Sequence, residues 1–293
     1  MTLRTFCRSP ETAMLPVRPA DIRPQLASRP MGETGRGMLQ GKVALVSGAG
    51  AGIGAATARR FAEEGAALWL NDLRADALAR LIDELEGRGA EVGGTAGDMS
   101  DSAYVDTWVA DVVERHGRID VLYNNVGVSR SGLVGDLSDE DWRFQQAVTL
   151  DSVFFATRAV LPNMIAAGGG SIVSMSSGAG IGGNYNLGGY AAAKAGVINL
   201  METVATEYGE FGVRANSVTP GPTDTAPLRA YLETRPGGIE AHVADLDLAR
   251  LTDPEEVANT VLWLASDLSS SLTGICVRSN IRAASRRPNR NES

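Results

Sequence analysis

From Gly41 onward, short apolar runs alternate with longer stretches in which apolar residues recur with the period of a helix. The runs are four to seven residues long, and most are rich in Val, Ile, Leu and Ala. This composition is typical of strands that are buried on both faces of a sheet. Strands are therefore predicted at residues 42–47, 67–71, 91–97, 120–124, 171–175, 213–218 and 274–277.

The stretches between these runs predict helices. Helices are expected at residues 53–64, 75–85, 104–115, 139–165, 190–208 and 254–265, and the fourth is long enough to be broken. Strands that alternate with helices through short links form a parallel sheet covered on both faces. We therefore expect one α/β domain over residues 39–277, with a Rossmann-type, doubly wound parallel sheet.

The two ends of the chain differ from this body. Residues 1–38 carry five prolines and no apolar period, which predicts a disordered leader. An organelle-targeting segment and a start at Met38 are the alternatives to an inert leader. Residues 278–293 form a basic tail with five arginines and one acid, which is typical of a solvated end.

The body between these ends is acidic, with 16 basic and 31 acidic residues over 39–277. This charge argues against a nucleic-acid partner and disfavours an anionic substrate. No run of eighteen apolar residues exists, which argues against a membrane span. Two cysteines and two histidines predict neither a disulfide framework nor a metal site. We expect a cytoplasmic protein that acts on a small molecule.

A glycine-rich segment, Ser47-Gly-Ala-Gly-Ala-Gly-Ile-Gly54, joins the first predicted strand to the first predicted helix. Glycines at Gly48, Gly52 and Gly54 permit a tight turn, close approach of a pyrophosphate and close packing of the helix on the sheet. The helix amino end then faces the phosphates. The segment predicts a dinucleotide site, and a purely structural turn is the alternative.

An acid follows the second predicted strand. Asp72 lies eighteen residues after Gly54, where a carboxylate accepts hydrogen bonds from ribose hydroxyls and repels a 2′-phosphate. Ala51 offers no cation to such a phosphate, and Arg74 is the one opposing charge nearby. NAD is therefore favoured over NADP. Asp98, after the third strand, either faces the adenine or is a solvated loop acid.

Tyr190 and Lys194 lie four positions apart at the start of a predicted helix, and therefore on one helix face. A neighbouring cation favours the phenolate and lowers the pKa of a phenol that is otherwise a poor base. Ser177 ends the preceding strand, where its hydroxyl can hold a substrate oxygen. Without these neighbours, the Tyr-x-x-x-Lys spacing indicates only an exposed amphipathic helix.

Residues 39–275 resemble the classical short-chain dehydrogenase/reductase family. The resemblance depends on Ser47–Gly54, Asn124-Asn-Val-Gly127, Ser177, Tyr190 with Lys194, and Pro220-Gly221, in the family's order. It implies that Tyr190 is the acid/base, that Lys194 lowers its pKa and binds the nicotinamide ribose, and that Ser177 orients the substrate. It also implies cofactor contacts beyond the glycines and Asp72, at Asp98, Ile53, Met99, Asn125 and Thr225. In such a site Asn125 braces the central sheet near the adenosine, and Thr225 reaches the nicotinamide carboxamide.

The chain departs from the family pattern at two places. Thr149 stands where the family has an asparagine of the proton relay, so we expect weakened catalysis with Thr149 in that position. The usual Val-Asp-Gly-Gly ending is replaced by Thr273-Gly-Ile-Cys-Val277 and the basic tail. This edge often contributes to assembly in the family, so the altered ending bears on the homo-oligomer, dimer or tetramer, that we expect.

Two segments are expected to recognise the substrate. Residues 178–189 lead into Tyr190 and offer Asn184, Tyr185 and Leu187 as contacts, and residues 226–250 are expected to form a mobile lid. The leading hypothesis is an NAD-dependent oxidoreductase of a medium-sized secondary alcohol or ketone. The alternative is a catalytically impaired NAD-binding sensor or partner subunit.

Overall fold

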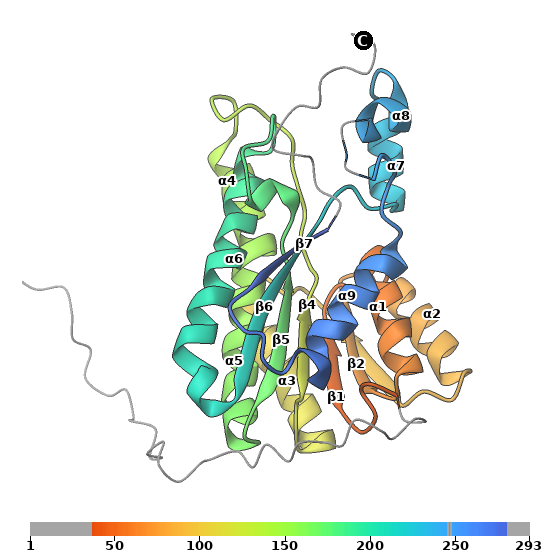
Figure 1. Ribbon diagram of the computed structural model, residues 1–293, viewed down its shortest axis with the longest axis vertical. Helices are drawn as coiled ribbons and strands as arrows, with labels where there is room; N and C mark the ends of the chain where they lie inside the picture. Colours follow the sequence, from red (N-terminus) through yellow and green to blue (C-terminus); the bar gives the residue numbers. More distant parts are fainter. Residues whose placement is uncertain (1–36, 245, 247, 280–293) are drawn as a thin grey trace, which may run out of the picture.

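The computed structural model describes residues 37–244, 246 and 248–279, and within them seven parallel strands form one sheet (Figure 1). The order across the sheet is β3-β2-β1-β4-β5-β6-β7. The strands are β1 (Val43–Val46), β2 (Ala67–Asp72), β3 (Val92–Ala96), β4 (Val121–Asn124), β5 (Gly170–Met175), β6 (Val213–Pro220) and β7 (Cys276–Ser279). The Rossmann-type fold predicted from the sequence is confirmed.

Helices cover both faces of this sheet. They are α1 (Gly52–Glu63), α2 (Ala75–Glu86), α3 (Ser102–His116), α4 (Asp139–Gln146), α5 (Ser152–Ala166), α6 (Gly188–Tyr208), α7 (Ala226–Glu233), α8 (Gly238–Val243) and α9 (Pro254–Ala265). One layer of buried apolar side chains lies between the sheet and α1, α2 and α9. The other layer lies between the sheet and α3, α5 and α6, so the core consists of two layers.

The strand order reverses between β1 and β4, which are neighbours in the sheet although two strands separate them in sequence. In open α/β sheets, ligands bind beyond the carboxyl ends of the strands at such a reversal. The glycine-rich segment follows β1 and the Asn-Asn-Val-Gly segment follows β4. The topology therefore brings both motifs to the place where this fold binds ligands.

The structure adds detail to three predicted segments. The predicted helix at 139–165 is interrupted by a π-helical turn, Ala147–Asp151, between α4 and α5. The expected lid at 226–250 contains the two short helices α7 and α8. The last strand ends at Ser279, two residues beyond the predicted domain boundary. The predicted leader up to residue 36 and the predicted tail from residue 280 lie outside the described residues.

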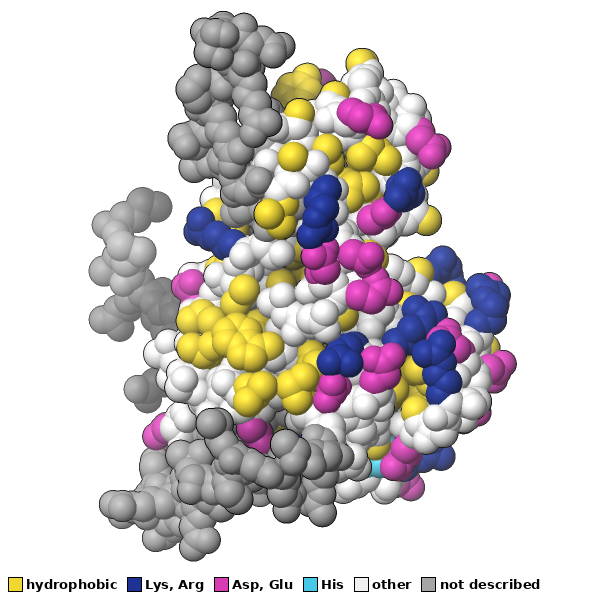
Figure 2. All heavy atoms as spheres, turned by 45° about the vertical axis from the view of Figure 1, so that its right-hand side comes forward, with side chains coloured by type: hydrophobic (Ala, Val, Ile, Leu, Met, Phe, Trp, Pro, Cys, Tyr) yellow, Lys and Arg dark blue, Asp and Glu magenta, His cyan; other side chains and the backbone are white. Residues whose placement is uncertain are grey.

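The face formed by α1, α2 and α9 carries interleaved acidic and basic side chains (Figure 2). Arg59 and Arg88 both pair with Glu84 at 2.7 Å, and Arg60 pairs with Glu64 at the same distance. Exposed pairs of this kind contribute little stability. They show that the cations of this face are engaged by neighbouring carboxylates.

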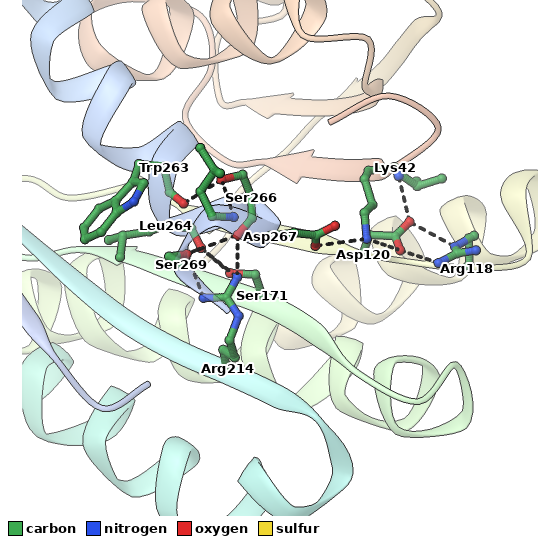
Figure 3. A network of polar contacts seen from close by, with 12 residues as sticks. Lys42, Arg118, Asp120, Ser171, Arg214, Trp263, Leu264, Ser266, Asp267 and Ser269 are labelled. Carbon is green, nitrogen blue, oxygen red and sulfur yellow. Dashed lines mark hydrogen bonds and ion pairs between the residues drawn. The ribbon is translucent and has the colours of Figure 1, made fainter. Parts of the chain in front are cut away.

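A polar network closes the amino-terminal end of the sheet (Figure 3). The Arg214 guanidinium, on β6, donates to the main-chain oxygens of Leu264 and Ser266 at 2.9 and 3.1 Å. It also donates to the Leu272 carbonyl at 3.3 Å and the Ser269 hydroxyl at 3.1 Å. These bonds fix the connection from α9 to β7 against the sheet.

Asp120 forms the second part of the network, at the start of β4. Its carboxylate accepts from the Val43 main-chain N–H at 2.9 Å and pairs with Arg118 at 2.5 Å. Lys42 lies 4.0 Å from Asp120 and 3.6 Å from Asp267, so it links the two parts. Asp120 thereby holds β1 and β4 in register at their amino-terminal ends. The ligand side of the sheet is at the opposite, carboxyl-terminal ends of these strands.

Candidate active site

The glycine-rich segment forms a tight turn onto α1. Gly48 and Gly52 have φ values of 64° and 54°, in the left-handed region that favours glycine. A Cβ at Gly54 would lie 2.1 Å from the Gly48 carbonyl oxygen, so only glycine fits there. Ala51 caps α1 without a side-chain hydrogen bond, and the first turn has no acid. The N–H groups of this helix end are therefore available to an anion.

Asn125 fastens the glycine turn to the end of β4. Its side-chain amide donates to the Gly48 carbonyl at 3.0 Å, and its main-chain N–H donates to the Ser47 hydroxyl at 3.1 Å. The Tyr123 hydroxyl donates to the Asn125 carboxamide oxygen at 3.2 Å. Asn125 thus holds the two motifs of the strand-order reversal together.

Asp72 lies against the glycine turn. One carboxylate oxygen accepts from the Gly50 N–H at 2.8 Å, and the other accepts from the Arg74 N–H at 2.9 Å. The guanidinium of Arg74 approaches the second oxygen at 3.4 Å and is 59% exposed. The oxygen that accepts from Gly50 keeps a further lone pair, with which it can accept from a ribose hydroxyl.

The remaining predicted cofactor residues lie at different depths. Asp98 is exposed and accepts from both the N–H and the hydroxyl of Ser100, at 2.9 and 2.8 Å. Met99 packs in the core beside α3, so its main chain alone can reach a ligand. Ile53 is partly buried in the first turn of α1. The methyl group of Thr225 lies 3.2 Å from the Cβ position of Gly52, so the segment before α7 meets the glycine turn.

Ser177 and Tyr190 come together beyond the end of β5. The Ser177 hydroxyl caps a short 3₁₀ turn by accepting from the Ala179 N–H at 3.2 Å. Tyr190 is in the first turn of α6. Burial raises the pKa of the Tyr190 phenol, and a hydrogen bond with Ser177 acts in the opposite direction. The two hydroxyl groups are thus placed to share one substrate oxygen.

Lys194 is buried one helical turn after Tyr190. Its ammonium donates to the Met175 carbonyl at 2.6 Å and lies 5.7 Å from the centroid of the Tyr190 ring. Burial lowers the pKa of Lys194 to about 7. The ammonium fits because Gly127 has no side chain: a Cβ there would lie 2.8 Å from Nζ. With such a pKa, Lys194 is only partly protonated at neutral pH. The lowering of the Tyr190 pKa by Lys194 requires the protonated form, and it stays a prediction.

Thr149 lies in the π-helical turn and is fully buried. Its hydroxyl accepts from the Val128 N–H and donates to the Val128 carbonyl, both at 3.3 Å. Directly after this turn, the Ser152 hydroxyl donates to the Val148 carbonyl within it at 2.7 Å. Such turns often occur at functional sites. The hydroxyl of Thr149 is therefore engaged by the loop after β4 and not by Lys194.

Two glutamines that the sequence did not single out position the start of α6. The Gln146 amide donates to the Gly189 carbonyl at 2.9 Å, directly before Tyr190. A Cβ at Gly189 would lie 2.6 Å from the Gln145 amide nitrogen, so this glycine permits α4 to approach closely. The paired glycines before Tyr190 were the available sign of such an approach, although they do not identify the partner.

Neither a metal centre nor a membrane span is indicated within the described residues. No three His, Cys, Asp or Glu side chains there gather closely enough to hold a metal ion. No helix among residues 37–244, 246 and 248–279 is long and apolar enough to cross a membrane.

Comparison with known proteins agrees with this geometry. Residues 48–279 match the family model described as enoyl-(acyl carrier protein) reductase. The chain is 41% identical to the 3-oxoacyl-[acyl-carrier-protein] reductase FabG of Thermotoga maritima, over 80% of this chain and 95% of that protein.

Two solved structures give the same result. The structure of a putative short-chain dehydrogenase/reductase from Burkholderia xenovorans is 38% identical and superposes with a TM-score of 0.79, over 83% of this chain and 97% of that one. A 7α-hydroxysteroid dehydrogenase complexed with NADH and 7-oxo glycochenodeoxycholic acid is 29% identical and has a TM-score of 0.79, over 84% and 97%. The chain therefore belongs to the short-chain dehydrogenase/reductase family, and it is an NAD(P)-dependent oxidoreductase that acts on CH–OH groups.

Proposed function

We propose that this enzyme transfers hydride between NAD and a secondary alcohol or ketone, with Tyr190 as the acid/base. The observation that carries the proposal is the meeting of Ser177, Tyr190 and Lys194 beside the strand-order reversal. A phenol, a hydroxyl and a buried cation in this arrangement suit proton transfer to or from a substrate oxygen. The solved hydroxysteroid dehydrogenase, complexed with NADH and an oxo compound, supports the same class of reaction.

The residues around the glycine turn fit a dinucleotide. The amino end of α1, which has no side-chain cap, suits the pyrophosphate, and Asp72 suits the adenosine ribose. Asn125 keeps the glycine turn in place. We propose that Ile53, Asp98, the main chain of Met99 and Thr225 complete these contacts. When bound, the nicotinamide supplies or accepts the hydride.

The chain's own residues then manage the oxygen and its proton. In ketone reduction, the Tyr190 hydroxyl donates its proton to the substrate oxygen, and the Ser177 hydroxyl donates a hydrogen bond to the same oxygen. In its protonated form, Lys194 favours the phenolate that remains. In alcohol oxidation the phenolate accepts the proton. We propose that Thr149 supports Lys194 through the π-helical turn, less effectively than the asparagine expected by family resemblance.

NAD is the preferred dinucleotide in this proposal. A 2′-phosphate would approach the Asp72 carboxylate, which sits against the Gly50 N–H at 2.8 Å. Arg74 is the only cation beside it in that segment, and its main-chain N–H is already bonded to Asp72. Thermal unfolding with NADH and with NADPH tests this preference: ligand at a hundred times its Kd stabilises the fold by about 2.7 kcal/mol.

The reaction itself is tested with Tyr190→Phe. We expect the turnover of a secondary alcohol with NAD to fall by about 100-fold or more, because proton transfer to a positioned side chain is lost. The rise in Tm with NADH should equal that of the parent, which shows that the fold and the dinucleotide site are intact. Equal turnover in the variant and the parent would contradict the assignment of Tyr190. A parent that binds NADH and turns over no alcohol or ketone would favour the alternative of a sensor or partner subunit.

We further propose a cytoplasmic location and a homo-oligomeric assembly. A nicotinamide-dependent reaction draws on a shared intracellular pool of dinucleotide, which supports the location. The apolar side chain of Trp263, 38% exposed, supports a contact between chains. Hydrophobic side chains gather in a patch on the face shown in Figure 2. Sedimentation measurements on the purified full chain test the assembly.

A further inference from the structure

Two loops meet directly before Tyr190. The loop at 128–137 follows β4, and the loop at 181–187 precedes α6. The Gly132 N–H donates to the Asn186 carbonyl at 2.9 Å, and Gly132 and Leu187 form a parallel bridge. A Cβ at Gly188 would lie 2.7 Å from a Val134 methyl group. The first loop is therefore packed onto the residues that lead into Tyr190.

The largest exposed side chains of these loops, apart from Arg130, are apolar. Val134 and Tyr185 are each 77% exposed, and Val128 and Leu133 are 43% and 47% exposed. Tyr231, on α7, is 45% exposed. The loop before α4 and the helices α7 and α8 stand on two sides of the upper end of the sheet (Figure 1). Exposed apolar side chains that gather beside a reactive site are typical of a binding surface for an apolar ligand.

Each arginine of the same segments has a partner close by. Residues 128–146, 178–189 and 221–252 hold five arginines and nine acids, and residues 178–189 hold no charge. Arg130 pairs with Asp141 at 2.5 Å and stacks on Phe144 at 3.8 Å. Three other arginines pair with carboxylates: Arg143 with Asp139, Arg229 with Asp224 and Arg250 with Glu256. Arg235 stacks over the ring of Tyr231. A phosphate or carboxylate beside the reacting carbon would meet no arginine of these segments that lacks a partner among the described residues.

We infer that the substrate is a ketone or secondary alcohol flanked by apolar alicyclic or aryl groups, with no anionic group near the reacting carbon. Val134 and Tyr185 are the residues that determine this specificity, by contact with the apolar body of the substrate. The inference rests on the proposed function, because it takes Tyr190 as the group that meets the substrate oxygen. It excludes a phosphate-bearing thioester as the preferred substrate.

The first experiment compares three classes of ketone with the full chain and NADH. The probes are 2-decalone and 4-phenyl-2-butanone, then acetoacetate, then acetoacetyl-coenzyme A. We expect kcat/KM for the apolar ketones to exceed both others by about tenfold or more, since apolar contact alone provides such a ratio. A higher value for acetoacetate or for the thioester would overturn the inference and leave the proposed function standing. No turnover of any probe, with a normal rise in Tm with NADH, would overturn both.

The second experiment tests the two specificity residues. Tyr185→Ser and Val134→Ser should each raise the KM for 2-decalone by about tenfold, with little change in kcat or in the KM for NADH. The KM for butanone should stay the same, because butanone is too small to reach the rim of the site formed by Val134 and Tyr185. Leu268→Ser is the matched control, because Leu268 is 67% exposed in the 3₁₀ turn Asp267–Ser269, within the amino-end network. An unchanged KM for 2-decalone in both rim variants, or an equal rise in the control, would refute the role of Val134 and Tyr185.

Discussion

Each end of the sheet holds a cationic side chain below the surface, and the two side chains differ in how many of their hydrogen-bond donors have a partner. At the amino end, Arg214 donates four hydrogen bonds, three of them to main-chain carbonyls. At the carboxyl end, Lys194 donates one to the described residues, to the Met175 carbonyl. Burial lowers the pKa of both, to about 7 for Lys194, and Asp267 opposes the shift at Arg214.

The difference separates structural from chemical use of a buried charge. The planar guanidinium of Arg214 has enough donors to satisfy a whole turn of carbonyls, and it stays charged at any physiological pH. Lys194 is a point charge with donors to spare, and its protonation changes near neutral pH. A charge that is fully bonded fixes a fold, whereas a charge with spare donors can bind and release a ligand or proton.

The largest expected effect comes from Lys194→Met. Turnover should fall by about 100-fold or more, because the acid/base group loses its cation. Stability should change in the opposite direction and depend on pH. The unfolded chain binds more protons than the folded one between about pH 7 and pH 10.5, so the burial penalty of Lys194 is complete below pH 7 and absent above pH 10.5.

Urea unfolding at several pH values, without added nucleotide, measures this effect. The methionine variant should be more stable than the parent at pH 6, and the difference should vanish as the pH approaches 10.5. A variant that is less stable at pH 6 than the parent would show that the Lys194 ammonium stabilises the fold, contrary to its lowered pKa.

A smaller effect, confined to stability, is expected from Arg214→Met. Four acceptors lose their donor, which we expect to cost about 3 kcal/mol, or roughly 10 °C in Tm. Turnover per folded molecule at 25 °C should not change, since the network lies at the end of the sheet away from Tyr190. Arg214→Lys, which keeps the charge with fewer donors, should lose part of this stability. A fall in turnover without a fall in Tm would contradict the purely structural role of Arg214 at the amino end of the sheet.

The smallest effect is expected from Thr149→Asn. The Thr149 hydroxyl is bonded on both sides to the Val128 main chain, and an asparagine has a longer side chain with both donor and acceptor groups. We expect a few-fold rise in turnover and a shift in its pH profile. Thr149→Ser, which keeps the hydroxyl, is the control and should behave like the parent. If neither the rate nor the pH profile changes in the asparagine variant, Thr149 has no part in supporting Lys194.

Sequence reasoning recovers the carboxyl end of the sheet better than the amino end, for a physical reason. The glycine turn and the Tyr190–Lys194 spacing are local patterns, because each places its residues on one turn or one helix face. Arg214 has main-chain partners about fifty residues away, and main-chain carbonyls leave no mark on side-chain identity. The network in Figure 3 was therefore not predictable from residue types.

The same limit applies within the site. The approach of Gln146 to Gly189 joins residues 43 positions apart, and the Val134 contact with Gly188 joins loops on different strands. The helices α7 and α8 were expected only as a lid, because Pro236 and the glycines after it mask the short helical periods on each side. Tertiary packing completes such short elements, and their local propensity is too weak to reveal them.

The π-helical turn Ala147–Asp151 gives the chain a tolerance in length of one residue at this place. A π turn contains one residue more than an α turn, and it absorbs that residue while the helices on either side keep their relative rotation. Deleting one residue within the turn would therefore leave a continuous α-helix, with Gln146 still directed toward Gly189. A second deletion would have no extra residue to remove, and it would turn α4 by about 100° relative to α5. Gln146 would then point away from Gly189, and the start of α6 would lose its support.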